Sequence, residues 1–187
     1  MKNYSLPIFP LAVLTTLLLT FSSCKKEESD NPNIVYRTVN KTITCIPGLS
    51  ATDTIDVNND GLSEMYFVIQ NLGADTGIIL LNSNSQPSGF AVGTLAPIPI
   101  IRVLNDGETT PLSASAYMST AYPTYKASGF REGLLSGDAY IAFRFTTGSK
   151  YNYGWMKISL NSAFTELKVI EYAYNLIPDE VIEVGAK

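Results

Sequence analysis

Hydrophobic and polar residues alternate most regularly between positions 138 and 174. Three runs rich in β-branched and aromatic residues, Ala139–Thr146, Tyr153–Leu160 and Leu167–Tyr174, are separated by short pieces that carry Gly148-Ser149 and Asn161-Ser162. Short turns between such runs are typical of an antiparallel meander. We therefore predict three consecutive strands here, which form the nucleus of a sheet.

The alternation assigns one face of each of the first two runs to the protein core. The core faces carry Ile141, Phe143, Phe145, Met156, Ile158 and Leu160. The opposite faces carry Tyr140, Arg144, Trp155, Lys157 and Ser159. The pattern predicts that each run buries one face, in a core between two sheets.

Upstream of the meander, apolar residues occur in short pieces with Gly, Pro, Asn, Asp or Ser between them. The pieces are Ile34–Ile46, Met65–Gln70, Ile78–Leu81, Phe90–Val92 and Ile98–Leu104. Many short strands with frequent turn signals indicate an all-β sandwich or barrel. For residues 34–187 we predict a single antiparallel β-sandwich, jelly-roll-like or similar.

Two further stretches of this domain have a local signature. Asn105-Asp106-Gly107 is a hairpin turn signal directly after an apolar piece. The stretch Pro111–Ala127 is rich in Ser, Ala, Thr and Tyr and lacks a clear period. It is therefore predicted to be a long loop or a short helix.

Residues 1–23 have the layout of a secretory signal peptide, with Lys2 before the apolar stretch Leu6–Leu19 and small residues before Cys24. A transmembrane anchor is the alternative, but the apolar run is short and contains Pro10. The stretch resembles the lipobox of bacterial lipoproteins, in which the cysteine is acylated, although Phe21 stands where that pattern usually has Leu. The resemblance implies that Cys24 carries lipid and attaches the protein to a membrane.

Residues 24–33 are too polar to bury surface and are predicted to be a flexible tether. The run Lys25-Lys26-Glu27-Glu28 resembles the signal that sends lipoproteins of Bacteroidota-type bacteria to the outer face of the outer membrane. That resemblance implies an outer membrane lipoprotein facing the cell exterior. The alternative is a solvated linker that carries no localisation signal.

Composition narrows the range of functions. The chain has 187 residues, a formal charge of −4 and no histidine. The lack of histidine removes the commonest general base, the commonest zinc ligand and every Ser-His or Cys-His nucleophile pair. The lack of a Lys/Arg cluster gives no footprint for nucleic acid. Cys45 is expected to be a small buried hydrophobe.

The segment Asp56–Glu64 carries the sharpest chemical motif. Oxygen-bearing side chains alternate at Asp56, Asn58 and Asp60, and Gly61 stands sixth. This order matches the start of a calcium loop, because glycine allows the sharp turn that folds the three side chains around one hard cation.

Two further ligands extend this candidate calcium site. Leu62 could add its backbone carbonyl and Glu64 its carboxylate. The twelfth position is Phe67 and not the bidentate glutamate of an EF-hand, so an EF-hand is rejected. The motif resembles D-x-N-x-D-G turns between strands of bacterial surface proteins, some of which bind calcium. A metal-free turn rich in Asn and Asp remains the alternative.

Aromatic residues of the irregular stretch supply a candidate ligand site. Tyr117, Tyr122 and Tyr125 could present flat rings to a polysaccharide or a partner protein. Packing of these rings into the fold is the alternative. For catalysis, a histidine-free glycan hydrolase would need two carboxylates. The carboxylates in or near the sheet region are Glu132, Asp138, Glu166 and Glu171.

The C-terminal part contains three short motifs: Tyr153-Gly154-Trp155, Ala173-Tyr174 and the ending Ile182-Glu183-Val184-Gly185. Together with the turn at Asp56–Gly61, they resemble the motifs of a widespread group of secreted bacterial β-sandwich proteins. That group has no established enzymatic activity, so the resemblance implies fold and secretion only. We expect a lipid-anchored cell-surface binding or structural module that is not an enzyme, with the glycan hydrolase as the alternative.

Overall fold

The computed structural model describes residues 31–73, 76–83, 89–92, 101–113, 116–118, 120–127, 130–133, 137–163 and 165–187. The regular secondary structure of these residues is β, and no α-helix occurs among them. All pairs of neighbouring strands are antiparallel. The prediction of an all-β, antiparallel protein is confirmed.

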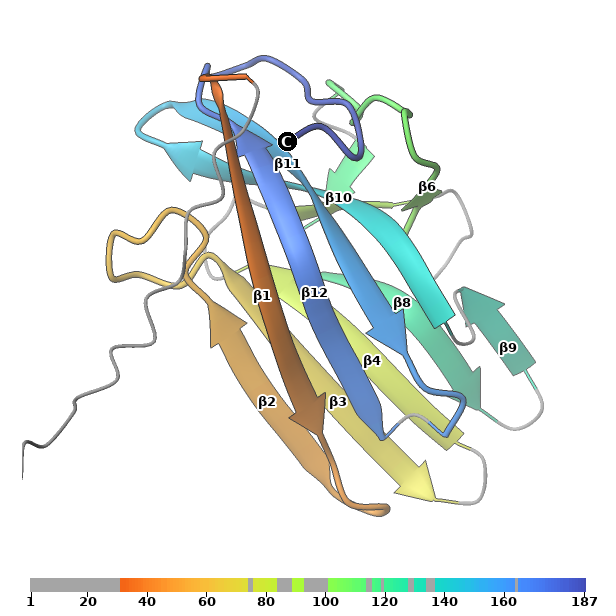
Figure 1. Ribbon diagram of the computed structural model, residues 1–187. Coiled ribbons are helices and arrows are strands. Elements are labelled where there is room, and N and C mark those ends of the chain that lie inside the picture. The colour runs from red at the N-terminus through yellow and green to blue at the C-terminus, as the bar shows by residue number, and fades with distance from the viewer. Residues whose placement is uncertain are drawn as a thin grey trace, which may run out of the picture.

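Within the described residues the strands form two sheets (Figure 1). The strands are β1 (Ile34–Thr44), β2 (Ser50–Ile55), β3 (Met65–Gly73), β4 (Thr76–Ser83), β5 (Gly89–Ala91), β6 (Val103–Leu104), β7 (Tyr117–Met118), β8 (Thr120–Ala127), β9 (Phe130–Gly133), β10 (Gly137–Thr147), β11 (Lys150–Leu160) and β12 (Glu166–Asn175). The 7-stranded sheet has the order β1-β12-β11-β10-β5-β7, with β6 paired to β10, and the 5-stranded sheet has the order β2-β3-β4-β8-β9. For β4, β8 and β9 the backbone alone is described.

The predicted meander is confirmed as β10, β11 and β12, which are neighbours in the 7-stranded sheet. Gly148, with a φ of 66°, lies in the turn between β10 and β11. Phe143 is paired with Gly154, and a Cβ atom on Gly154 would lie 2.4 Å from Cζ of Phe143 and 2.6 Å from the carbonyl oxygen of Ala173. Glycine is therefore required where the Phe143 ring lies against β11.

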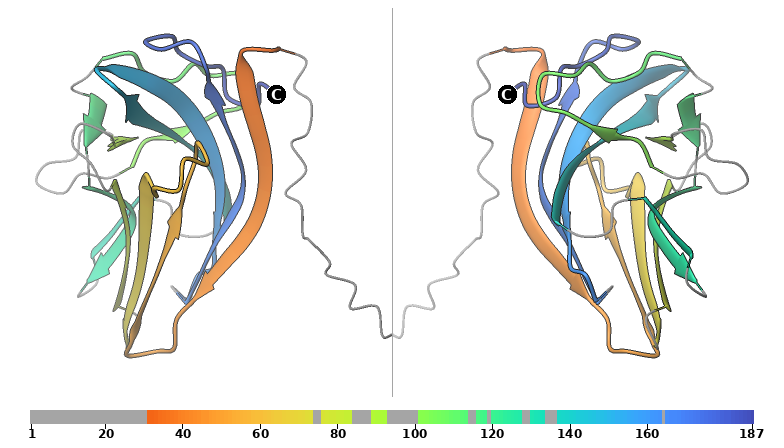
Figure 2. Two further views of the ribbon diagram at one scale, coloured as in Figure 1. Left: turned by 90° about the vertical axis from the view of Figure 1, so that its left-hand side faces the viewer. Right: turned by 90° about the vertical axis from the view of Figure 1, so that its right-hand side faces the viewer.

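The core lies between the two sheets. The six residues predicted to face it, Ile141, Phe143, Phe145, Met156, Ile158 and Leu160, are all at most 4% exposed. They share one cluster with Ile55, Phe67 and Ile69 of the 5-stranded sheet. Figure 2 shows the two sheets facing each other, and this cluster contains residues of both. The face assignment made from the alternation is confirmed.

The opposite face of the meander is also buried over part of its length, which corrects the prediction of one buried face per run. Trp155 is 0% exposed and belongs to a second apolar cluster that includes Tyr36. Ile182 and Val184 belong to the same cluster, so the chain after β12 covers this part of the sheet. The covering segment follows β12 along the chain, and the alternation within the meander does not indicate that this segment folds back over the sheet.

Backbone hydrogen bonds hold the covering segment against the turn predicted at 105–107. Val184 N–H donates to the Glu108 carbonyl at 2.9 Å, and Thr110 N–H donates to the Ile182 carbonyl at 2.9 Å. The turn itself forms, since Glu108 N–H donates to the carbonyl of residue 105 at 3.1 Å. The chain after the turn pairs with the C-terminal segment, however, so the turn does not close a local hairpin.

The stretch Pro111–Ala127 is not the loop or short helix predicted from its composition. Its second half is β8, which lies between β4 and β9 in the 5-stranded sheet. The register of β8 on β4 shifts between the pairs Ile79↔Thr124 and Leu81↔Ala121. Pro123 lies within this shift, where the ladder does not require its missing N–H. The bulge therefore explains how β8 accommodates a proline.

Lys41 connects the edge strands of the two sheets. β1 is the first strand of one sheet and β2 is the first strand of the other. The Lys41 ammonium group lies 2.7 Å from the Asp53 carboxylate and donates to the carbonyl of Thr54 at 2.8 Å. These contacts join β1 to β2 along one side of the molecule.

Candidate functional site

The segment Asp56–Glu64 forms the loop that joins β2 to β3. The last residue pair of these strands is Ile55↔Met65, so the loop begins and ends at neighbouring positions. Asn59 and Gly61 have φ values of 63° and 91°. Asparagine and glycine adopt this left-handed region at low cost, which is why the sequence can turn so sharply here.

The Asp56 carboxylate organises the loop backbone. Its Oδ1 accepts the N–H groups of Asn59 and Asp60 at 2.6 and 3.2 Å, and its Oδ2 accepts the N–H of Gly61 at 2.8 Å. The Asp60 carboxylate accepts the N–H of Leu62 at 2.8 Å. The two carboxylates thus fix the loop around themselves, as Asx turns do.

Glu64 supplies a third carboxylate to this loop, and its side chain is buried. It is 9% exposed, and its Oε2 accepts the Val57 N–H at 2.7 Å. Burial raises the pKa of the Glu64 carboxyl, and the negative charges of Asp56 and Asp60 raise it further. A buried carboxylate beside two others is unfavourable when ionised, and a bound cation would remove that cost.

Asp56, Asp60 and Glu64 each offer a carboxylate oxygen, and these oxygens lie within 4.8 Å of one another. Calcium ligands lie about 2.3–2.6 Å from the ion, so ligand oxygens around one ion are separated by up to about 5 Å. The three described carboxylates therefore lie at a spacing that one calcium ion could bridge.

The other two predicted ligands, Asn58 and Leu62, are not carboxylates. The Asn58 amide is engaged with Asp60, since its Nδ2 donates to the Asp60 carboxylate at 3.0 Å and its Oδ1 accepts the Asp60 N–H at 2.9 Å. Asn58 thus braces the loop through Asp60. For Leu62 the predicted ligand is the backbone carbonyl, which stays a prediction, while its side chain is 72% exposed. The carboxylates that converge are those of Asp56, Asp60 and Glu64.

A residue that the sequence did not indicate anchors this loop to the rest of the fold. The Tyr172 hydroxyl of β12 donates to the Val57 carbonyl at 3.0 Å. Tyr172 is 1% exposed, and Val57 is 0% exposed. The two residues are 115 positions apart, so no local pattern could have paired them.

The aromatic site is corrected at Tyr117. Its side chain is 6% exposed, its ring centroid lies 5.7 Å from that of Tyr153, and the Arg144 guanidinium carbon lies 4.8 Å from its ring centroid. Burial raises the pKa of Tyr117 well above its ordinary value. Tyr117 therefore packs in the second apolar cluster and does not offer a surface plane. Tyr122 and Tyr125 lie on β8, and their side chains are outside the described part of the structure.

The predicted lipidation site, Cys24, lies outside the described residues and stays a prediction. Among those that are described, no helix is long and apolar enough to cross a bilayer. Cys45 is half-buried and packs against the core, and burial raises the pKa of its thiol.

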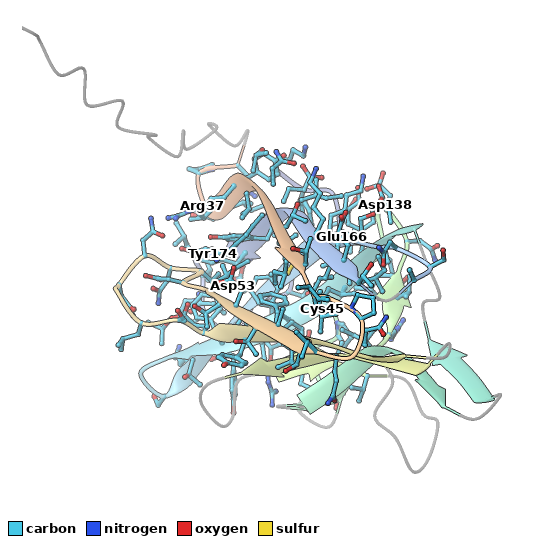
Figure 3. All side chains as sticks on the ribbon, turned by 90° about the horizontal axis from the view of Figure 1, so that it is seen from below. Arg37, Cys45, Asp53, Asp138, Glu166 and Tyr174 are labelled. Atoms are coloured by element: carbon cyan, nitrogen blue, oxygen red, sulfur yellow. The ribbon has the colours of Figure 1, made fainter. Side chains whose placement is uncertain are left out.

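Of the carboxylates considered for hydrolysis, Asp138, Glu166 and Glu171 belong to strands of the 7-stranded sheet, and Glu132 belongs to β9 of the 5-stranded sheet. Glu171 accepts hydrogen bonds from the Tyr36 hydroxyl and from the Lys187 ammonium group. Asp138 lies 3.6 Å from the Lys157 ammonium group. Figure 3 labels Asp138 and Glu166, both of which are exposed, and the side chain of Glu132 is not described.

Comparisons with protein-family models, with curated proteins and with solved structures give no match to this chain.

Proposed function

We propose that this protein is a lipid-anchored binding or structural module of the cell surface, and that it uses calcium to fix the loop between β2 and β3. In this proposal the two sheets form a single, jelly-roll-like β-sandwich, held to the outer membrane through acylated Cys24 and facing the cell exterior. Its partner is a surface polysaccharide or another surface protein. The shared core of the two sheets supports the architecture. The signal-like stretch before Cys24 supports the anchor.

One observation carries the calcium part of the proposal. The carboxylates of Asp56, Asp60 and Glu64 converge within 4.8 Å, although their mutual repulsion opposes this arrangement. Oxygen-only ligands with several negative charges suit a hard divalent cation, and the flexible coordination of calcium tolerates such a loop better than the strict octahedron of magnesium. Calcium bound here would offset the repulsion and stabilise the fold.

Calcium titration tests this part. We expect binding by isothermal titration calorimetry and a higher melting temperature in calcium than in chelator, with magnesium less effective. At a calcium concentration of a hundred times the dissociation constant, the gain in unfolding free energy is about 2.7 kcal/mol. Asp60→Asn should weaken binding, whereas the matched control Glu166→Gln, an exposed carboxylate at the start of β12, should not. Equal melting temperatures in calcium and chelator would leave the loop as a metal-free turn.

The anchor is tested separately by fractionation. The parent protein should partition with membranes and be released only by detergent, because two or more acyl chains hold a protein stably at a bilayer. Cys24→Ser should abolish acylation and release the protein in soluble form. A Cys24→Ser protein that stays with the membrane fraction would contradict the proposed attachment.

A further inference from the structure

The chain enters the fold at the end of the molecule where β12 ends. β1 begins at Ile34, whose N–H donates to the Asn31 carbonyl at 3.0 Å. The Leu176 N–H, directly after β12, donates to the Asn33 carbonyl at 2.7 Å. Figure 1 shows the start of β1 and the end of β12 side by side. We call this the entry end.

Exposed apolar side chains lie at the entry end. Leu176 and Ile177 are 47% and 36% exposed. The Asp56–Glu64 loop lies in the same half of the molecule, because Tyr172, three residues before the end of β12, holds it through Val57. Leu62, within that loop, is 72% exposed. Three large apolar side chains thus face solvent in the half of the molecule where the chain enters.

A second exposed apolar pair marks the opposite end. Ile46 and Leu49 are 68% and 58% exposed, and they flank the turn between β1 and β2. The Leu49 N–H donates to the Ile46 carbonyl at 3.0 Å, and Gly48 has a φ of 85°. β1 has 11 residues, so at about 3.3 Å per residue this turn lies roughly 35 Å from Ile34. The pair at this far end serves as a built-in comparison for the entry end.

We infer that the entry end rests on the lipid surface, with Leu62, Leu176 and Ile177 in contact with the boundary between headgroups and acyl chains. The inference rests on the proposed anchoring at Cys24. Six residues separate Cys24 from Asn31, and even when this segment is fully extended its seven residue-to-residue steps span at most about 25 Å. An anchored chain therefore keeps the entry end close to the bilayer.

Tethering also explains why so small an apolar surface suffices. Three side chains would bind a membrane weakly from solution, because interfacial binding scales with the buried apolar area. A short tether makes the contact intramolecular, at an effective concentration in the millimolar range, so a weak contact is well populated. The acidic loop in the same half of the molecule opposes contact with anionic lipid, so the surface that fits best is zwitterionic.

Site-specific quenching tests this orientation on the full-length, acylated chain in phosphatidylcholine vesicles. Cys45 is changed to Ser, and a single cysteine carrying a fluorophore replaces Leu62, Ile177 or, as control, Leu49. Interfacial side chains reach a depth of about 5–10 Å, where a lipid-borne quencher can be placed. We expect the labels at positions 62 and 177 to lose at least half of their emission, and the label at position 49 to keep it.

A second measurement separates contact from mere proximity. With the label at position 62, the pair Leu176→Ser and Ile177→Ser should remove most of the quenching, whereas the pair Ile46→Ser and Leu49→Ser at the far end should leave it unchanged. Quenching at position 49 alone, or equal emission at all three positions, would overturn the orientation.

Vesicle flotation separates failure of the orientation from failure of the anchor. In the Cys45→Ser chain without an added cysteine, Cys24 is the remaining cysteine, and a thiol label reacts with it only if it is not acylated. If this chain is labelled and the protein does not float with vesicles, both the anchor and the inference are wrong. If the protein floats but the entry-end labels are not quenched, the anchor stands and the inference alone is wrong.

Discussion

The Tyr172 hydroxyl and the Val57 carbonyl form a 3.0 Å hydrogen bond that ties the candidate calcium loop to the opposite sheet. Tyr172 belongs to β12 of the 7-stranded sheet, and Val57 follows β2 of the 5-stranded sheet. The bond therefore makes the position of the loop depend on how the two sheets pack.

The first prediction concerns this bond. Tyr172→Phe keeps the ring in the core but leaves the buried Val57 carbonyl without that donor, at a cost of about 1–2 kcal/mol in unfolding free energy. We also expect weaker calcium binding, because the loop loses its tie to β12. Urea unfolding and calorimetry measure the two effects. The control is Tyr140→Phe, a half-buried ring on the other face of the sheet, which should change neither. Unaltered stability of Tyr172→Phe would mean that the bond contributes nothing.

The second prediction concerns pH and Glu64 in the absence of calcium. Burial, together with the charges of Asp56 and Asp60, raises the pKa of this carboxyl in the folded protein above its ordinary value of 4.5. The folded state then holds its proton more tightly than the unfolded state does. Its contribution to stability is complete below pH 4.5 and is lost as the pH rises through the folded pKa.

Glu64→Gln tests that sign, since glutamine keeps an acceptor for the Val57 N–H but does not ionise. In chelator, the unfolding free energy of the parent should fall relative to that of the variant as the pH rises above 4.5. The control Glu166→Gln alters an exposed carboxylate and should track the parent. A parent-to-variant difference that is constant across this range would show that Glu64 has an ordinary pKa.

The third prediction couples Phe143 and Gly154. Phe143→Ala should cost about 3–5 kcal/mol because the ring is fully buried. Gly154→Ala should cost about 1–3 kcal/mol, since its Cβ would overlap the Phe143 ring and the Ala173 carbonyl. In the double variant the Phe143 ring is absent, so Gly154→Ala should cost less than it does in the parent. Some cost should remain, because the Cβ still overlaps the Ala173 carbonyl. Urea unfolding of all four proteins measures the coupling, and strict additivity would argue against the close contact.

The fourth prediction concerns the partner. If the rings of Tyr122 and Tyr125 bind a surface polymer, the double change to Ala should weaken retention on a polysaccharide affinity gel while the melting temperature stays unchanged. Tyr117→Ala is the contrasting variant, because that ring is buried and its loss should lower stability. Early melting of the Tyr122 and Tyr125 variant would show that its rings are core.

The sequence predicted best those features that depend on local alternation. The inward positions of β10 and β11 follow from a strict period of two, and all six proved buried. The Asp56–Glu64 loop could be recognised because its chemistry lies within nine consecutive residues. Burial of Trp155 on the other face could not be foreseen from the alternation of β11, since it depends on the segment of Ile182 and Val184 folding back over that face.

β8 and the Tyr172–Val57 bond show two other limits. The composition of Pro111–Ala127 and its lack of a clear period favoured a loop or a short helix, yet residues 120–127 form β8, in which the bulge opposite β4 accommodates Pro123. The hydrogen bond joins residues 115 positions apart, and only the packing of two sheets brings them together. Tertiary context overrides local preference in strands more readily than in helices, because much of strand stability comes from neighbours.

The contacts of Lys41 with β2 have a consequence for molecules that are crowded together. An open strand margin is a template on which another molecule can add a strand, and a charged side chain turned inward at that margin is one of the ways in which proteins prevent this. Lys41 donates a hydrogen bond to the Thr54 carbonyl and forms an ion pair with Asp53. The open edge of β2 is therefore already in contact with a side chain of the same molecule. Copies crowded on a two-dimensional surface would meet edge to edge often, and this lysine favours their remaining separate molecules over their joining into fibres.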